Sequence, residues 1–167
     1  NSGVILSQLF RGFAKGLEGK SVVDTLGYAE ALQAGADTAY KAVMKPIEGT
    51  MLTVARVTAE ESRKIAKEEK NFLPFYSAII EIAKDTLDKT PDMLPALKQA
   101  GVVDSGGMGL LYILMGANEA LSGDFEYSSS VVELEKASPS IETSEKTEME
   151  DLKYGYCTEF LINNIYP

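Results

Sequence analysis

Apolar side chains recur at helical spacing through the first 121 residues. Between residues 3 and 17 they form one stripe at positions i, i+3, i+4, i+7 and i+11, namely Leu6, Leu9, Phe10, Phe13 and Leu17. The same spacing, interrupted at glycines and prolines, predicts further helices at residues 22–44, 48–70, 73–89, 91–100 and 107–121. The pattern therefore predicts an all-α domain over residues 1–121, built as a bundle of amphipathic antiparallel helices.

Capping residues and composition refine these helices. Ser21 or Asp24 is placed to cap the second helix, and Thr90 followed by Pro91 marks the start of the short fifth helix. The second helix is rich in alanine, which permits the close approach of a neighbouring helix. The second half of the third helix carries so many charges that we expect it to project into water.

The pattern changes after residue 121. Residues 122–150 are dominated by Ser, Thr and Glu, and they carry eight acidic against two basic side chains. We expect this segment to be an acidic linker. Residues 154–162 read Y-G-Y-C-T-E-F-L-I and alternate in polarity, which predicts the first strand of a second domain over residues 151–167. A strand without its own sheet offers an open edge, so a homodimer could form through this strand or through the rest of the second domain.

Composition narrows the classes of function. The sequence has no histidine and one cysteine, which excludes His-based catalytic triads, His-ligated metals and internal disulfides. The net charge is −9, of which −6 comes from residues 122–150, and no basic stripe indicates a nucleic-acid partner. No apolar run reaches about 18 residues and no secretory leader is present, so we expect a cytoplasmic protein without a membrane span. The chain begins with Asn1 in place of Met, so we expect it to be cut from a longer protein.

Three loops at predicted helix starts have the small and polar residues of an anion site. They are Asn1–Gly3, Lys45–Thr50 and Val103–Gly107. Backbone N–H groups at a helix start bind anions, and glycines let the backbone approach a ligand closely. Each loop also has an ordinary structural interpretation, as a capped terminus, an interhelical turn and a flexible turn respectively. The third loop lacks the Gly-Lys-Ser/Thr of a Walker A motif and the preceding strand of a dinucleotide fingerprint.

The order of the helices bears on whether these loops can form one site. In an antiparallel bundle, every second helix begins at the same end. The loops begin the first, third and sixth predicted helices, so they share an end only if the short fifth helix breaks the alternation. On that condition we expect the three loops to lie near one another.

Three ordered motifs carry a family resemblance: N-S-G-V-I-L-S-Q-L-F-R-G, A-Y-K-A-V-M-K-P-I-E-G-T-M-L-T-V and G-V-V-D-S-G-G-M-G-L-L. Together they resemble the nucleotide-binding domain related to the L subunit of dihydroxyacetone (glycerone) kinase, and above all its bacterial fatty acid kinase branch. The resemblance covers residues 1–121 and continues into Y-G-Y-C-T-E-F-L-I. It implies a barrel of antiparallel amphipathic helices that binds ATP and Mg²⁺ at one end.

The resemblance also implies which residues hold the nucleotide. The family's phosphate loop corresponds to Asn1, Ser2 and Gly3. Its loop near the phosphates and adenine corresponds to Thr50 and Met51, and its nucleoside loop corresponds to Asp104, Ser105 and Gly106. The residue types suit these roles, because N–H groups and hydroxyls bind phosphate and a methionine side chain suits a flat purine.

The activity that the resemblance implies is an ATP-dependent kinase whose acceptor is held by a separate protein. The acceptor would be a fatty acid carboxylate on a DegV-type fatty-acid-binding protein, or dihydroxyacetone on a ketose-binding subunit. The family's Mg²⁺ ligands are aspartates of a D-G-D-T-G type motif, which this sequence lacks and which we expect upstream of Asn1. The catalytic residues are therefore unassigned, no metal site is predicted, and we expect the chain alone to be inactive.

Three further points remain open on the sequence. Cys157 matches a zinc ligand of the family's middle domain, but without further ligands in this chain an unpaired thiol is the ordinary interpretation. The missing aspartates also leave room for a non-catalytic interaction or regulatory module that keeps the helical domain. The bundle interior could in addition enclose a lipid, because amphipathic helices with few large aromatics can leave an apolar cavity.

Overall fold

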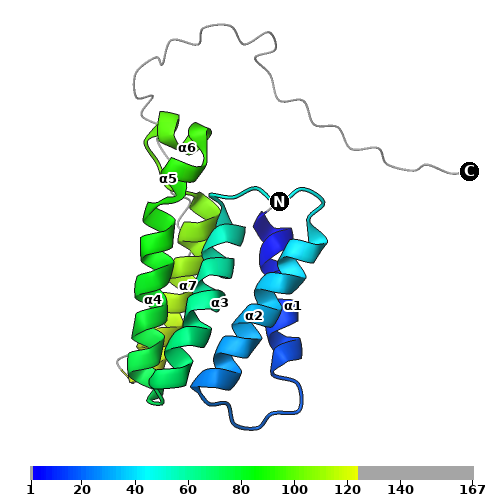
Figure 1. Ribbon diagram of the computed structural model, residues 1–167, viewed down its shortest axis with the longest axis vertical. Coiled ribbons are helices and arrows are strands. Elements are labelled where there is room, and N and C mark those ends of the chain that lie inside the picture. Colours follow the sequence, from blue (N-terminus) through cyan, green and yellow to red (C-terminus); the bar gives the residue numbers. More distant parts are fainter. Residues whose placement is uncertain (1, 124–167) are drawn as a thin grey trace, which may run out of the picture. The chain divides into compact units, whose positions relative to one another are not determined.

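Seven helices make up the part of the chain that the computed structural model describes, residues 2–123 (Figure 1). The long ones are α1 (Ser2–Gly16), α2 (Thr25–Ala42), α3 (Met51–Glu68), α4 (Phe72–Asp88) and α7 (Ser105–Ser122), and the short ones are α5 (Thr90–Met93) and α6 (Pro95–Ala100). Residues 2–123 contain no strand, so the prediction of an all-α domain is confirmed for them. Asn1, residues 124–150 of the predicted linker, the predicted strand and Cys157 lie outside the described residues.

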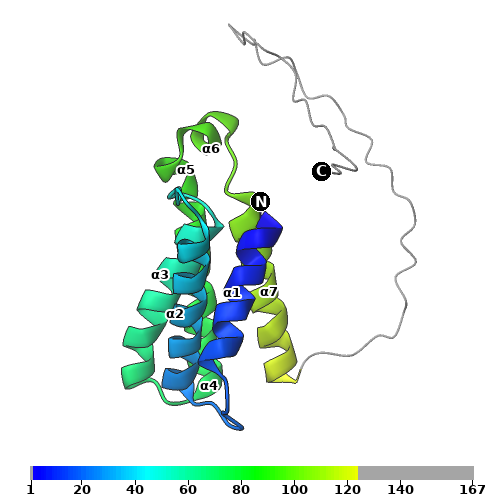
Figure 2. The same cartoon turned by 90° about the vertical axis from the view of Figure 1, so that its right-hand side faces the viewer.

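The long helices run antiparallel along one axis (Figures 1 and 2). α1 packs on α2, α2 on α3 and α3 on α4, while α7 packs against both α4 and α3. The short helices α5 and α6 do not cross the bundle but lie at the end where α4 stops and α7 starts. Within residues 2–123 no helix is both long enough and apolar enough to cross a lipid bilayer.

Small residues let α1 and α2 approach closely. A Cβ atom on Gly12 would clash with the carbonyl oxygen of Ala34, and one on Gly35 would lie 2.8 Å from the carbonyl oxygen of Leu9. Ala31 on the same helix is completely buried. The close approach that the alanine-rich second helix predicts is therefore present, and glycines on both helices contribute to it.

An apolar and aromatic core joins α2, α3, α4 and α7. Its largest fully buried side chains are Tyr76, Phe75, Ile79 and Leu87. Burying an apolar side chain of this size contributes about 1.5–3 kcal/mol to folding. Tyr28 of α2 reaches into this core, where its hydroxyl donates a 3.2 Å hydrogen bond to the hydroxyl of Tyr76. Burial, followed by the neighbouring Tyr76, raises the pKa of Tyr28 far above its ordinary value, so the buried pair stays uncharged.

The prediction of one helix over residues 91–100 is wrong, because two short helices occupy this stretch. Pro95 lacks an N–H group and forces the preceding residue out of the helical conformation, which leaves Leu94 extended at φ −126° and ψ 108°. Thr90 is the first residue of α5 and not its cap. Its hydroxyl donates a 2.7 Å hydrogen bond to the carbonyl of Leu87 instead.

The last long helix extends beyond its predicted limits at both ends. It begins at Ser105, because the Asp104 carboxylate caps its first turn, and it ends at Ser122, one residue into the predicted linker. Gly123 follows with a φ of 80°, the left-handed conformation that commonly ends helices.

The second half of α3 does not project into water as expected. Ser62 and Ala66 are fully buried there, and the charged side chains occupy the opposite, solvent-facing side. The start of α2 settles the choice between the two predicted caps. The carboxylate of Asp24 accepts a 2.8 Å hydrogen bond from the backbone N–H of Gly27.

Candidate functional site

The described parts of the three loops lie at one end of the bundle (Figures 1 and 2). We call this the loop end, and it comprises Ser2–Gly3, Lys45–Thr50 and Val103–Gly107. α1, α3 and α7 all begin there, because α5 and α6 remain at this end and return the chain to the same side. The short segment between the long helices thus breaks their up-down alternation, which is the condition on which the three loops can share one end.

The start of α1 stands apart from the other two loops. Ser2 and Gly3 are exposed and belong to the first turn of the helix. A Cβ atom on Gly3 would meet no atom within 4 Å. The structure therefore brings these two residues to the loop end without packing them against the other candidate residues.

Thr50 and Met51 form the start of α3. Thr50 is the N-cap residue, but its hydroxyl donates a 2.8 Å hydrogen bond to the carbonyl of Ile47 and makes no capping bond to α3. The described residues supply no hydrogen-bond acceptor for the N–H groups of Met51 and Leu52. Helix starts of this kind present free N–H groups and the positive end of the helix dipole. Met51 itself is 5% exposed and packs into the core below the loop.

Asp104, Ser105 and Gly106 form the start of α7, and they contact α3. The Asp104 carboxylate accepts a 2.7 Å hydrogen bond from the N–H of Gly107, so it already serves as a cap. A Cβ atom on Gly106 would lie 3.2 Å from the Met51 side chain, and one on Gly107 would lie 3.0 Å from apolar atoms of α3 and α4. Close packing therefore accounts for both Gly106 and Gly107. Ser105 remains exposed.

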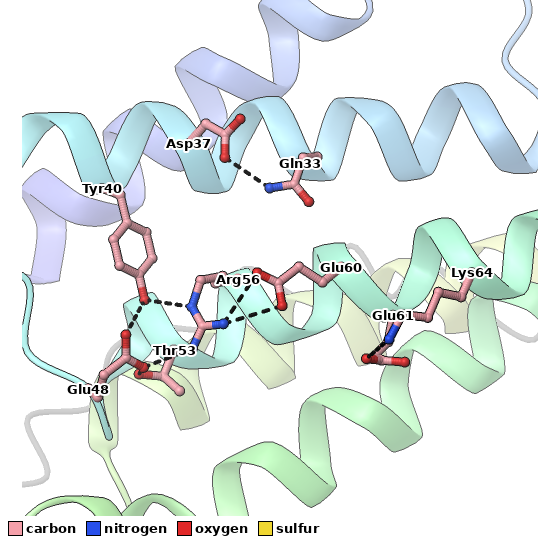
Figure 3. A network of polar contacts seen from close by, with 9 residues as sticks. All are labelled: Gln33, Asp37, Tyr40, Glu48, Thr53, Arg56, Glu60, Glu61 and Lys64. Atoms are coloured by element: carbon pink, nitrogen blue, oxygen red, sulfur yellow. Dashed lines mark hydrogen bonds and ion pairs between the residues drawn. The ribbon is translucent and has the colours of Figure 1, made fainter.

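A polar network beside these loops was not predicted from the sequence (Figure 3). Its centre is Glu48, whose carboxylate accepts hydrogen bonds from the hydroxyl of Thr53 at 2.7 Å, from Nη2 of Arg56 at 3.0 Å and from the hydroxyl of Tyr40 at 3.1 Å. Nε of Arg56 donates to the Tyr40 hydroxyl at 3.2 Å, and Nη1 lies 3.3 Å from both carboxylate oxygens of Glu60. The one available signal was a single arginine in the otherwise uncharged first half of α3.

The network shifts the pKa values of its members. Burial acts to raise the pKa of Glu48, but hydrogen bonds from Thr53, Arg56 and Tyr40 outweigh it and hold the pKa below its ordinary value. The hydrogen bond with Tyr40 is the largest effect on Arg56, whose pKa rises despite partial burial. Burial raises the pKa of the Tyr40 hydroxyl. At neutral pH the network therefore contains a carboxylate, a guanidinium ion and a neutral phenol.

The described residues do not fit a magnesium site. Mg²⁺ is held by oxygen ligands, chiefly carboxylates. Among residues 2–123 no three acidic, Cys or His side chains converge. The two carboxylates nearest the loops are already engaged, Asp104 with the N–H of Gly107 and Glu48 with Arg56.

An apolar cavity of about 170 Å³ lies along the inside of the bundle, away from these polar groups. Side chains of α1 and α7, among them Leu6, Phe10 and Ile113, line it. The polar groups in its lining are few, namely the hydroxyls of Tyr28, Thr58 and Tyr76, so the cavity suits an apolar ligand better than a phosphate group. The helix starts at the loop end are therefore the better candidates for an anion site.

Comparison with known proteins assigns the chain to a family. The family model described as the DAK2 domain matches residues 1–119. Protein YloV of Bacillus subtilis (strain 168) is 44% identical over 166 residues, which are 97% of this chain and 30% of that protein. An uncharacterized protein of Staphylococcus saprophyticus is 46% identical over 165 residues, with the same coverage of 97% and 30%. This chain thus spans about 30% of the length of these curated relatives. Because the family model matches nearly all of the described helical domain, the chain belongs to the DAK2 domain family.

Proposed function

We propose that this chain is the ATP-binding part of a two-component kinase. DAK2 domains belong to the dihydroxyacetone kinase family, so the chain is related to kinase subunits. In the proposed reaction the bond between the γ-phosphorus and the β,γ-bridging oxygen of ATP breaks, and a new bond forms to an oxygen of the acceptor. A hydroxyl acceptor also gives up its proton, whereas a carboxylate acceptor yields an acyl phosphate directly.

The observation that carries this proposal is the convergence of three helix starts at the loop end. The dipoles of α1, α3 and α7 all point their positive ends to this side of the bundle. Asp104 already caps α7, whereas no side chain caps α3. The start of α3 is therefore where the phosphates of the nucleotide are best received, with Thr50 as the nearby hydroxyl. Ser2, Gly3, Ser105 and Gly106 would surround the rest of the ligand.

For the acceptor and the metal we propose a chemical class and a role, but no binding residues. We place the acceptor, a fatty acid carboxylate on a DegV-type protein or dihydroxyacetone on a ketose-binding subunit, on a separate partner. Magnesium bound to ATP would offset the charge of the phosphates. We assign no residue of 2–123 to it, because no suitable ligand set converges there. We place the reaction in the cytoplasm, where ATP is supplied.

Calorimetric titration of ATP with Mg²⁺ into the 167-residue chain tests the proposal. We expect binding. We expect Thr50→Ala to weaken it by about 1–3 kcal/mol, because in the bound state the Thr50 hydroxyl would exchange its bond to the Ile47 carbonyl for one to a charged phosphate. Thr50→Ser should retain most of the affinity. Ser122→Ala, at the far end of α7, is the matched control and should leave the affinity unchanged. Equal affinity of wild type and Thr50→Ala, with helicity intact by circular dichroism, contradicts the assignment of the phosphates to α3.

A non-catalytic interaction module is the second candidate function. The observation that favours it is the absence of converging carboxylates among residues 2–123. The same titration separates the two, because an interaction module without nucleotide would show no heat of binding with ATP or ADP.

A further inference from the structure

We propose that Glu48 and Arg56 are positioning residues, which hold the turn at Gly49 and Thr50 in the geometry that receives the nucleotide phosphates at the start of α3. This inference rests on the proposed function and adds to it the device that shapes the phosphate-binding turn. Neither residue needs to touch the nucleotide for this role.

One side of the turn is tied to the network of Figure 3. The Thr53 hydroxyl donates to Glu48 at 2.7 Å and accepts the N–H of Gly49 at 2.9 Å. Since Arg56 and Tyr40 also bind the Glu48 carboxylate, this one side chain connects the turn to both α2 and α3. The backbone of Gly49 is therefore fixed before any ligand arrives.

The other side of the turn rests on α5. Gly49 has a φ of 81°, a conformation that side chains rarely adopt. A Cβ atom there would also lie 3.0 Å from Cβ of Met93 and 3.1 Å from the carbonyl oxygen of Thr90. The turn is thus confined between α5 and the polar network, so loosening the network frees one of its two sides.

The charge of Glu48 gives the pair a second role. Its carboxylate lies two residues before the N-cap of α3, where an unpaired negative charge would repel phosphate. The 3.0 Å ion pair with Arg56 offsets this charge. Removing Arg56 alone should therefore harm anion binding more than removing both charges, a pattern that lost rigidity alone does not produce.

The test measures ATP affinity by calorimetry in Arg56→Ala, Glu48→Gln and the double variant of the 167-residue chain. We expect Arg56→Ala to weaken binding about tenfold, and the double variant to recover at least about threefold of that loss. Arg56→Lys keeps the charge but loses the planar fork, and it should fall between wild type and Arg56→Ala. A double variant as weak as Arg56→Ala, or an Arg56→Ala affinity equal to wild type, overturns the inference.

Two controls separate local from general effects. Glu61→Gln breaks the exposed ion pair on the same helix in which Nζ of Lys64 lies 2.6 Å from Oε1 of Glu61. This variant should leave ATP affinity unchanged. Glu60→Gln removes the other partner of Arg56 without touching the turn, and it should have a smaller effect than Arg56→Ala. An equal loss of affinity in these controls would mean that the effect is not specific to Glu48, which also overturns the inference.

Hydrogen exchange of the Gly49 amide distinguishes failure of this inference from failure of the proposed function. Faster exchange in Glu48→Gln and Arg56→Ala than in wild type supports the hold on the turn, and unchanged exchange overturns it. If wild type binds no ATP, the proposed function falls, and with it the nucleotide role of the pair. The exchange data then still decide whether the pair holds the turn.

Discussion

Individual hydroxyl groups link the loops of this molecule. The side chain of Thr90 is completely buried, and its hydroxyl accepts the N–H of Asp104 at 3.1 Å while it donates to the carbonyl of Leu87. Thr53 connects Gly49 to Glu48 in the same way. Buried polar groups are costly unless both donor and acceptor are satisfied. Each hydroxyl therefore fixes the loop that it serves relative to the core.

The stabilising effect of Glu48 should depend on pH. Its pKa lies below the ordinary value of 4.5 in the folded chain, so its contribution is complete above that value and is lost as the pH falls through the folded pKa. Because the pair with Arg56 is partly exposed, we expect Glu48→Gln to lower the free energy of unfolding at neutral pH by less than about 1 kcal/mol. Urea unfolding between neutrality and about pH 3 should show this difference shrinking. A difference that widens in acid would contradict the prediction. In an Arg56→Ala background the effect of Glu48→Gln should be smaller, because only Thr53 and Tyr40 then donate to the carboxylate.

Local signals at single residues were readable in the sequence, and distant pairings were not. Asp104 and Thr50 stand at helix starts, as their side chains and the flanking glycines indicate, because capping depends on neighbours within a few positions. The hydrogen bond between Tyr40 and Arg56 joins residues that are 16 positions apart and lie on different helices. Such a pairing depends on how α2 and α3 are rotated against each other, which only packing decides.

Among the helices, α1 and α2 show how much depends on the size of a side chain. Gly12 and Gly35 bring the two backbones together where larger residues would hold them apart. By contrast, a Cβ atom on Gly116 in α7 would meet nothing within 4 Å. Identical substitutions at these glycines therefore have opposite consequences.

We expect Gly12→Ala to destabilise the domain by about 1–3 kcal/mol, because the added methyl forces α1 away from α2. Gly116→Ala should stabilise it by up to about 1 kcal/mol, because alanine favours a helix where space is free. Thermal unfolding followed by circular dichroism measures both. A Gly12→Ala variant as stable as wild type would mean that α1 and α2 are not closely packed in solution.

The existence of the long helices could be predicted from the spacing of apolar residues. The residues at which the helices end, and the faces that they bury, were harder to predict. Pro95 carried the signal that splits residues 91–100, yet the helical pattern on both sides concealed it. The charges of α3 predicted exposure correctly for one face only. Ser62 and Ala66 on the other face are small enough to pack against neighbours, and so the helix is buried along one side to its end.

At the scale of the whole molecule, the common location of the loops depended on the path taken between α4 and α7. The sequence allowed α5 and α6 either to cross the bundle or to remain at one end. Their short length, four and six residues, leaves no room for a crossing of the bundle. Which loops become neighbours is thus a property of the full topology, and no single motif determines it.

We expect limited proteolysis of the 167-residue chain to cut first within residues 124–150. Their composition is acidic and aperiodic, whereas residues 2–123 have a core of their own. The measurement is mass spectrometry of early fragments, with a product ending near residue 123 resistant to further digestion. Early cuts inside α2 or α3, or equal protection of both parts, would contradict the domain organisation predicted here.

The five bundle-length helices of residues 2–123 have a consequence for reach. An odd number of passes means that the chain enters the bundle at the loop end and leaves α7 at the opposite end. Eighteen residues of helix separate the two ends by about 27 Å. The 27 residues 124–150 could extend by up to about 90 Å, which exceeds the distance between the two ends of the bundle, so their length alone would allow what they tether to reach the loop end. Anything attached beyond them is therefore joined to the bundle at the end opposite the nucleotide site that we propose at the loop end.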